Sequence, residues 1–244
     1  MSTASELLAE FPQMNVDVLL EAASDTTSMQ IVADPSGASG NVIRCELNKT
    51  DDDVASSKRS ELAYGVIRPE LKTTYGFSTW FPSAWEVDVS PEIIFQLHAT
   101  PDSGTGEPFR SPPLSFIVKN DRLFCEIRKD ETAVTVGNPA TYKEFDLIPA
   151  VTDRLEEWLD WEITIQWSDY LKPEQNGRVT IKLNGAVVLD FTGYVGYNDV
   201  KGIFGKFGLY KWPWTDDPSN SSTTQRVLYY KPMTENLVSS IATP

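Results

Sequence analysis

Short runs of alternating apolar and polar residues dominate the chain from residue 29 onward. Such runs predict β-strands because they are rich in β-branched and aromatic residues and are bounded by Gly, Pro, Asn or Asp. Asn184-Gly185 between two of these runs is a strong two-residue hairpin signal, and Asn120-Asp121 predicts a second hairpin. The predicted strands are Met29–Ala33, Val42–Leu47, Ser60–Ile67, Tyr75–Phe81, Ile93–Ala99, Leu114–Lys119, Leu123–Lys129, Glu162–Trp167, Arg178–Leu183, Ala186–Phe191, Lys206–Tyr210 and Gln225–Tyr230.

Helical patterns are brief. Residues 5–8 and Val16 to Ala23 predict a tail or short helix before the first strand, and Thr152 to Leu159 predicts one internal helical turn. Many short strands with so little helix predict an all-β jelly-roll sandwich of two antiparallel sheets. We therefore expect an N-terminal tail or short helix over residues 1–28, packed on a single jelly-roll domain over residues 29–244.

Composition narrows the function classes. The chain has 244 residues, of which 41% are hydrophobic, and this is enough for one large domain with a real core. The formal net charge of −14 argues against general nucleic-acid binding, although a local basic cleft can still bind an anionic ligand. Apolar runs long enough to span a membrane are absent from the sequence. Cys45 and Cys125 allow at most one disulfide, and two buried free thiols are equally compatible with the sequence.

Three of the predicted strands carry polar side chains on a single face. Successive side chains of a strand point to opposite faces, so residues two apart lie side by side. The polar pairs obtained in this way are Arg59 with Glu61, Gln96 with His98, the one histidine of the chain, and Lys206 with Tyr210. If the three strands lie in one concave sheet, these side chains line a groove, and Gly208 leaves room for a ligand.

Each pair by itself has an ordinary structural explanation. Arg59 and Glu61 can form a surface ion pair, Tyr210 can be half-buried with its hydroxyl at the rim of the core, and Lys206 can be a solvated charge. A lone histidine on a strand is most often simply hydrogen-bonded or exposed. The combination of a guanidinium, an amide, an imidazole, an ammonium and a phenol is what indicates a site.

These three segments resemble the signature strands of the jelly-roll polysaccharide lyases. Arg59-Ser60-Glu61-Leu62, Gln96-Leu97-His98 and Lys206-Phe207-Gly208-Leu209-Tyr210 follow the order of the Arg-Thr-Glu-Leu-Arg, Gln-Ile-His and Tyr-Phe-Lys-Ala-Gly-x-Tyr strands of alginate lyases. The surrounding sequence is similar to that of the glucuronan and heparin lyases, and the resemblance covers residues 41–230. It implies a concanavalin A-like jelly roll whose concave sheet forms the substrate groove.

The chain departs from the alginate-lyase pattern at two places. Ala63-Tyr64 stands where alginate lyases prefer a second arginine, and Phe204-Gly205 stands where a tyrosine usually opens the last motif. One contact to the sugar is therefore missing. These differences favour another uronate polymer, such as glucuronan, over alginate.

The activity that the resemblance implies is β-elimination in a uronic-acid polysaccharide, giving an unsaturated uronate end. Arg59 and Gln96 would neutralise the uronate carboxylate, because the C5 proton beside it is only weakly acidic. His98 or Tyr210 would remove that proton, and Tyr210 would protonate the leaving oxygen. Because a phenol is a poor base at neutral pH, Tyr210 would need Arg59 and Lys206 to lower its pKa. Lys206, Glu61, Arg128 and Trp212 are the predicted substrate-binding residues.

Two other functions are compatible with such a fold. A lectin or carbohydrate-binding module would use tryptophans as sugar platforms, and Trp212-Pro213-Trp214 is the best candidate, whereas Trp80, Trp161 and Trp167 lie in strand-like segments and are expected in the core. A jelly-roll glycoside hydrolase needs two paired carboxylates, and Glu86 to Glu92 superficially resembles its acidic strand. Because Pro91 interrupts this segment, we expect a loop there.

The catalysis proposed here requires no metal or other cofactor. Asp51-Asp52-Asp53 or Asp216-Asp217 could hold a structural calcium ion, although acidic surface loops are usually only solvated. We expect an anionic polysaccharide as the partner, no nucleic acid or membrane, and a monomer. Residues 1–30 lack the basic start and apolar stretch of a secretory signal. We expect an extracellular protein whose signal either lies outside this sequence or was never used.

Overall fold

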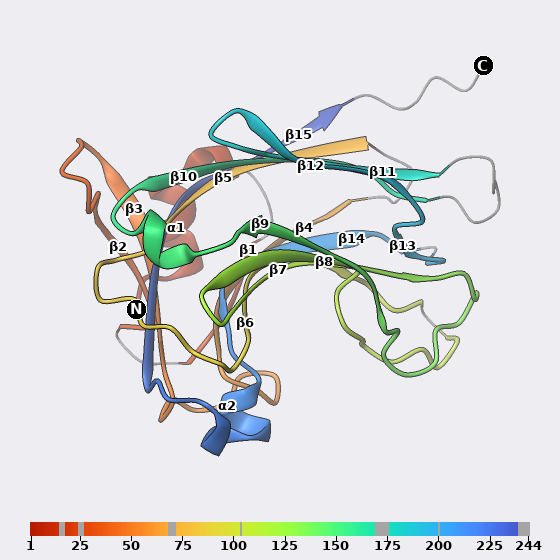
Figure 1. Cartoon of the computed structure of the whole chain (residues 1–244), viewed down its shortest axis with the longest axis horizontal. Coiled ribbons are helices and arrows are strands. Elements are labelled where there is room, and N and C mark those ends of the chain that lie inside the picture. The colour runs from red at the N-terminus through yellow and green to blue at the C-terminus, as the bar shows by residue number, and fades with distance from the viewer. Residues whose placement is uncertain are drawn as a thin grey trace.

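The computed structural model describes residues 1–14, 18–23, 27–67, 72–102, 104–168, 176–199 and 201–238. Two β-sheets are stacked face to face, and the lower one in Figure 1 curves away from the upper one. No helix among these residues has the length and apolar character needed to cross a membrane. The predicted all-β jelly-roll sandwich is confirmed.

The sheet that carries the candidate site has eight strands. All neighbouring pairs are antiparallel except β13 with β8. Their spatial order is β1 (Val18–Ala22), β4 (Arg59–Ile67), β14 (Ile203–Tyr210), β6 (Glu92–Ala99), β7 (Leu114–Lys119), β8 (Arg122–Asp130) and β13 (Gly196–Tyr197), with β9 (Thr141–Ile148) also paired to β8. The three strands with polar faces, β4, β14 and β6, are thus direct neighbours.

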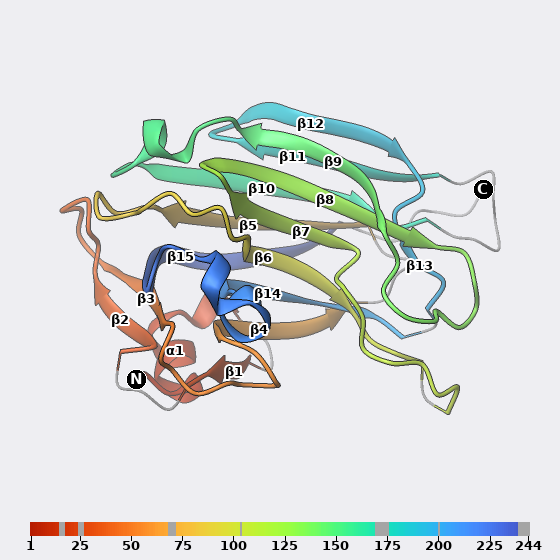
Figure 2. The same cartoon turned by 60° about the horizontal axis from the view of Figure 1, so that its bottom comes forward.

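The second sheet backs the first. It has seven strands, in the order β12 (Ala186–Gly193), β11 (Gly177–Leu183), β10 (Trp158–Gln166), β5 (Lys72–Trp80), β15 (Gln225–Val238), β3 (Asn41–Asn48) and β2 (Met29–Ala33). The helices are short: α1 (Ala4–Glu10), α2 (Pro213–Asp216), and the 3-10 helices η1 (Pro12–Met14), η2 (Val151–Arg154) and η3 (Pro218–Asn220). In Figures 1 and 2, α2 projects from the outer face of the eight-stranded sheet.

The core lies between the two sheets and is mostly aromatic at its centre. Phe95 of β6 stacks on Phe77 of β5 with ring centroids 4.7 Å apart, and Phe116 of β7 meets Trp161 of β10 edge-on at 5.1 Å. Close packing of this kind fixes the height of each strand relative to the opposite sheet. Because these side chains alternate with those of the outer face, they also determine which residues of β6 and β7 face outward.

The two predicted hairpins are confirmed by their backbone geometry. Asn184 and Gly185 have φ values of +50° and +80°, and Asn120 and Asp121 have +52° and +67°. Two consecutive positive φ values are typical of a type I′ turn, whose twist matches that of the flanking strands. The second hairpin joins β7 to β8 at the edge of the groove described below.

The N-terminal segment differs from its prediction. The helix over Ala4–Glu10 is confirmed and is capped by Thr3 and Glu6, but the helix predicted over Val16 to Ala23 is wrong because residues 18–22 form strand β1. β1 adds to the outer edge of the site-bearing sheet, where Glu21 lies opposite Glu61. Pairing with the free edge of β4 outweighs the local pattern, as is common for edge strands.

The predicted internal helical turn is shorter than expected. η2 covers only Val151–Arg154, because β10 begins at Trp158 and pairs with β5 along its length. Strands β9 and β13 are absent from the prediction. β9 is largely exposed, so its sequence lacks a clear apolar face, and β13 has only two residues.

Candidate active site

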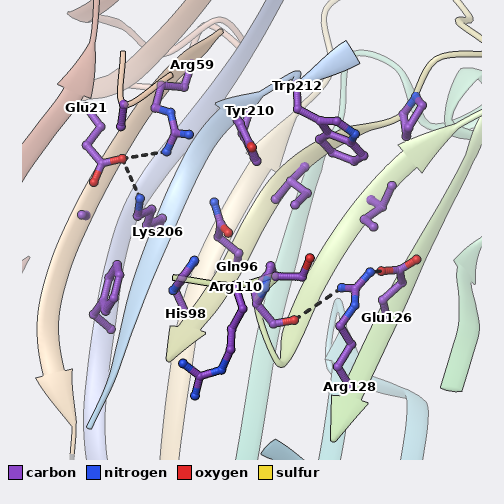
Figure 3. A pocket seen from close by; sticks show the side chains of 18 of the residues that line it. Glu21, Arg59, Gln96, His98, Arg110, Glu126, Arg128, Lys206, Tyr210 and Trp212 are labelled. Atoms are coloured by element: carbon purple, nitrogen blue, oxygen red, sulfur yellow. Dashed lines mark hydrogen bonds and ion pairs between the residues drawn. The ribbon is translucent and has the colours of Figure 1, made fainter. Parts of the chain in front are cut away.

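A groove of about 2190 Å³ runs over the outer face of the eight-stranded sheet. Its floor is formed by the polar faces of β4, β14 and β6, and it extends across β7 and β8. Seven of the eight predicted site residues line it, namely Arg59, Gln96, His98, Arg128, Lys206, Tyr210 and Trp212. Figure 3 shows these side chains converging from separate strands.

Two cations and one carboxylate form a corner at the β1 edge of the groove. Glu21 Oε2 accepts hydrogen bonds from Arg59 Nη1 at 2.9 Å and from Lys206 Nζ at 2.6 Å. Both basic side chains are largely buried, with 10% of Arg59 and 6% of Lys206 exposed. This charged corner, Arg59, Lys206 and Glu21, is drawn with dashed lines in Figure 3.

The predicted substrate contact of Glu61 is not supported by its position. Its side chain is only 1% exposed and lies beneath the groove floor, where it accepts a hydrogen bond from Gln96 Nε2 at 2.5 Å and is 3.5 Å from Arg59 Nη1. Burial raises the pKa of Glu61, and the positive charges of Lys206 and Arg59 and the bond from Gln96 oppose this rise. Glu61 therefore orients Arg59 and Gln96 from below.

Gln96 retains part of its hydrogen-bonding capacity for a ligand. A primary amide has two N–H donors and one acceptor oxygen, and Glu61 accepts only one of these donors. The Gln96 side chain lies on β6 next to Lys206 of β14, its register partner. An amide fixed in this way can donate to a carboxylate bound at the charged corner.

His98 lies between two phenylalanine rings. It stacks on Phe204 with centroids 5.0 Å apart and faces Phe109 at 5.8 Å. His98 Nδ1 is 2.9 Å from the carbonyl oxygen of Ala99, and since a carbonyl can only accept, Nδ1 carries the proton and Nε2 has a free lone pair. Burial lowers the pKa of His98 to about 4, despite the hydrogen bond to Ala99, which raises it. The imidazole is therefore neutral at pH 7 and able to accept a proton.

Tyr210 stands across the groove floor at the end of β14. Its ring lies under the Arg59 guanidinium, 4.4 Å from ring centroid to Cζ, and contacts Trp212 at 5.5 Å. The Arg59 charge lowers the pKa of Tyr210, as expected, but not enough to make the phenol a base at neutral pH. Burial raises the pKa of Tyr210, and the Arg59 charge offsets only part of that effect, so the phenol keeps its proton at neutral pH.

A distortion in β14 sets the direction of Tyr210. The register between β14 and β6 shifts between Phe207 and Tyr210, where Gly208 has φ of +133°. A Cβ atom at Gly208 would lie 2.1 Å from the carbonyl oxygen of Ser60, so this glycine permits close approach of β14 and β4. The prediction that Gly208 leaves room for a ligand is therefore wrong.

A tyrosine from the opposite sheet forms hydrogen bonds to the two strands at the same distortion. Tyr230 of β15 is fully buried, and its hydroxyl lies 2.7 Å from the carbonyl oxygen of Ile94 and 2.9 Å from that of Gly208. These two carbonyls belong to β6 and β14, the strands that carry His98 and Tyr210. The Tyr230 hydroxyl thus links the strands of the site to the sandwich behind them.

The remaining predicted residues lie toward the other walls of the groove. Trp212 is partly exposed next to Tyr210, whereas Trp214 is buried with its indole N–H bonded to Ser221 at 2.7 Å. Arg128 lies on β8, two strands from β6, and pairs with Glu126 at 2.5 Å. The expected core positions of Trp80, Trp161 and Trp167 are confirmed.

The groove residues that sequence reasoning missed include Glu21, Phe109, Arg110 and Phe204. Phe204 is two positions before Lys206 on the same strand, so alternation could have found it. Phe109 and Arg110 belong to the long polar segment 100–113, a type of loop that often borders a binding site. Glu21 was missed because a helix was predicted over Val16 to Ala23, whereas Val18–Ala22 form strand β1.

One acidic cluster among the described residues has a geometry compatible with metal binding. Asp102, Glu107 and Asp199 place carboxylate oxygens within 4.8 Å of one another. Arg110, however, forms ion pairs with Glu107 at 3.3 Å and with Asp199. The Arg110 guanidinium already offsets part of this negative charge, and its ion pairs hold the loop that carries Phe109.

The carboxylates of the acidic segment that resembled a hydrolase strand do not line the groove. Residues 86–91 form a loop, as expected from Pro91. Asp88 and Glu92 are buried in ion pairs with Lys211 and Arg226, and neither lines the groove. The two cysteines, Cys45 and Cys125, are free thiols in the core, and burial raises the pKa of both.

The family model for polysaccharide lyases matches residues 9–233. The chain therefore belongs to the polysaccharide lyase family, and the predicted enzyme class is confirmed. A search of curated proteins gave no match.

Solved structures of polysaccharide lyases have the same fold. The endo-β-1,4-glucuronan lyase of the fungus Trichoderma reesei aligns with a TM-score of 0.73 and 17% identity over 90% of each chain. A substrate complex of the family 7 alginate lyase A1-II′ aligns with a TM-score of 0.59 and 15% identity over 99% of this chain and 100% of that one. Alginate lyase Aly36B aligns with a TM-score of 0.60 and 15% identity over 97% and 91%.

Proposed function

We propose that this lyase cleaves a uronic-acid polysaccharide of the glucuronan or alginate type by β-elimination, leaving an unsaturated uronate end. The observation that supports this most is the convergence of His98, Tyr210 and the charged corner on one groove. A base, an acid and a cationic carboxylate site are the three parts that the reaction requires.

The uronate carboxylate is placed at the charged corner, where Arg59, Lys206 and the Gln96 amide offer hydrogen-bond donors. Neutralising this carboxylate is essential, because removal of the C5 proton sends electron density into it. Preorganised donors aimed at the developing negative charge stabilise such a transition state. Their burial strengthens the effect, because the surrounding dielectric is lower than that of water.

His98 then acts as the base and Tyr210 as the acid. His98 Nε2 takes the C5 proton, the electron pair forms the C4–C5 double bond, and the C4–O bond breaks while Tyr210 gives its proton to the leaving oxygen. The lowered pKa of His98 and the raised pKa of Tyr210 favour this assignment over the reverse. A bound uronate brings a negative charge near His98 and raises its pKa toward a value more useful for a base.

Glucuronan is the preferred candidate substrate. Ala63 lines the groove where alginate lyases prefer an arginine, and Phe204 covers His98 where those enzymes have a tyrosine in the motif. The structural likeness to a glucuronan lyase supports the same choice. Because such polymers are too large to cross a membrane, we infer that the enzyme acts outside the cell.

The test is to incubate the protein with glucuronan, alginate and heparin and to follow the ultraviolet absorbance of the conjugated unsaturated uronate. We expect absorbance to grow with at least one polymer, and fastest with glucuronan. A lectin or a hydrolase gives no such signal. His98→Asn and Tyr210→Phe should each lower kcat by about 10²- to 10⁴-fold, the range of a lost general acid or base.

Tyr142→Phe is the matched control, because Tyr142 is a partly exposed tyrosine of β9 that does not line the groove. It should keep the wild-type rate. Full activity in both His98→Asn and Tyr210→Phe would refute the assigned roles, and no unsaturated product from any uronate polymer would refute the proposed function.

A further inference from the structure

Among the residues that the structure describes, Glu21 is the one carboxylate that forms ion pairs with both cations of the charged corner. Its Oε2 atom lies 2.9 Å from Arg59 Nη1 and 2.6 Å from Lys206 Nζ, and its side chain is 16% exposed to the groove. β1 holds it at the edge of the sheet through pairing with β4. In Figure 3, Glu21 lies on the same side of the groove floor as the two cations.

The charge of the corner is smaller than its two basic side chains suggest. Burial alone would raise the pKa of Glu21, but the hydrogen bond and charge of Lys206 and the charge of Arg59 outweigh burial and hold the pKa below its ordinary value. Glu21 is therefore ionised at neutral pH, and two positive charges less one negative charge leave at most a single positive charge. Any ionisation of the neighbouring Glu61 makes the corner less positive still.

The same compensation extends along the groove. Arg128 pairs with Glu126, and Arg122 pairs with Glu144, and all four residues line the groove. A site for a densely charged polyanion usually offers cations without resident acidic partners. This groove instead suits a polymer that brings no more than one negative charge to each sugar position.

We propose that Glu21 is a specificity-determining residue that admits uronates with a carboxylate alone and rejects uronates that carry an additional sulfate. This inference rests on the proposed function, since it places the uronate carboxylate at the charged corner. The net charge there is at most one positive charge, which offsets no more than one carboxylate. A sulfate on the same sugar adds a second negative charge, which faces the Glu21 carboxylate in a partly buried site where screening by solvent is weak.

The experiment compares the unsulfated polymer that the wild type cleaves best with the same polymer after chemical O-sulfation. The measured quantity is the ratio of kcat/KM on the unsulfated polymer to kcat/KM on the sulfated one. We expect Glu21→Gln to lower this ratio at least about tenfold, which corresponds to about 1.4 kcal/mol. Glu21→Ala should shift the ratio in the same direction, and Glu21→Asp, which keeps the charge, should retain most of the preference.

Glu162→Gln is the matched control. Glu162 lies on β10 in the opposite sheet and pairs with Lys182 Nζ at 2.6 Å, the same distance as between Glu21 and Lys206. This variant changes the net charge equally and should leave the ratio unchanged. Thermal unfolding followed by circular dichroism checks that all variants are folded.

An unchanged ratio in Glu21→Gln and Glu21→Ala would overturn the inference, because it means that Glu21 does not discriminate between the two polymers. If kcat/KM falls equally on both polymers, Glu21 only positions Arg59 and Lys206. If kcat/KM rises equally on both, Glu21 only competes with the substrate carboxylate. Failure of the wild type to cleave any uronate polymer is a different result, because it refutes the proposed function instead.

Discussion

Replacing Gly208 with alanine tests the closest strand approach in the site. A Cβ atom there would lie 2.1 Å from the carbonyl oxygen of Ser60 and 2.7 Å from Cα of Glu61. Both are backbone atoms of β4, so no side-chain rotation relieves the contact. β14 and β4 must separate by about 0.9 Å to reach 3.0 Å, the distance below which real Cβ contacts essentially never occur.

The free-energy cost of Gly208→Ala has two parts. A non-glycine residue at φ of +133° is strained by about 1–3 kcal/mol, and separation of the strands weakens ladder hydrogen bonds worth about 1 kcal/mol each. We expect Gly208→Ala to lower the free energy of unfolding by about 3–5 kcal/mol, which lowers the Tm by about 10 °C for a chain of this size. The kcat should also fall, because Tyr210 follows two residues later.

Comparison with Gly40→Ala in a denaturation assay separates the backbone strain from the clash with β4. Gly40 has φ of +111°, but nothing lies within 4 Å of a Cβ atom there, so this variant has the strain without the clash. Urea denaturation followed by circular dichroism should show Gly208→Ala to be less stable than Gly40→Ala by about 2 kcal/mol. Equal losses in the two variants would refute the close approach of β14 and β4.

Two further predictions concern groups next to the site. Tyr230→Phe removes the hydroxyl that bonds to the carbonyls of Ile94 and Gly208, so the free energy of unfolding should fall by about 1–3 kcal/mol. The kcat should fall more than KM changes. An unaffected kcat would contradict the idea that these hydrogen bonds help to position Tyr210. His98 has a folded pKa of about 4, below its ordinary 6.5, so the unfolded chain binds more protons between these values and stability should decrease as pH falls from 6.5 to 4. His98→Asn should make this decrease smaller, as measured by unfolding at several pH values, and an identical pH profile in both proteins would contradict the lowered pKa.

Local pattern was sufficient for most of the fold. Twelve of the strands that pair in the two sheets come from predicted runs such as Arg178–Leu183, in which buried residues alternate with more exposed ones as the sequence pattern predicts. The hairpins at Asn120-Asp121 and Asn184-Gly185 depend only on the left-handed conformations that these residues tolerate. The side-by-side placement of Gln96 and His98 follows from the same two-residue period.

Other features depend on partners that are distant in sequence. Glu21 meets Lys206 across 185 positions, because β1 joins the edge of β4 and β14 inserts between β4 and β6. Strand order of this kind arises from long-range pairing and packing, which no local window contains. The burial of Glu61 and the direction of the Tyr210 pKa also depend on how deeply the assembled sheet covers each group.

The sequence by itself determined which side chains share a strand face, because that is fixed by backbone geometry over a few residues. Only the tertiary structure decided which faces meet, how much water reaches them and which charges are already paired. Desolvation and charge pairing act through space, so the residues that set the electrostatics of the groove could be identified only after the chain had been folded.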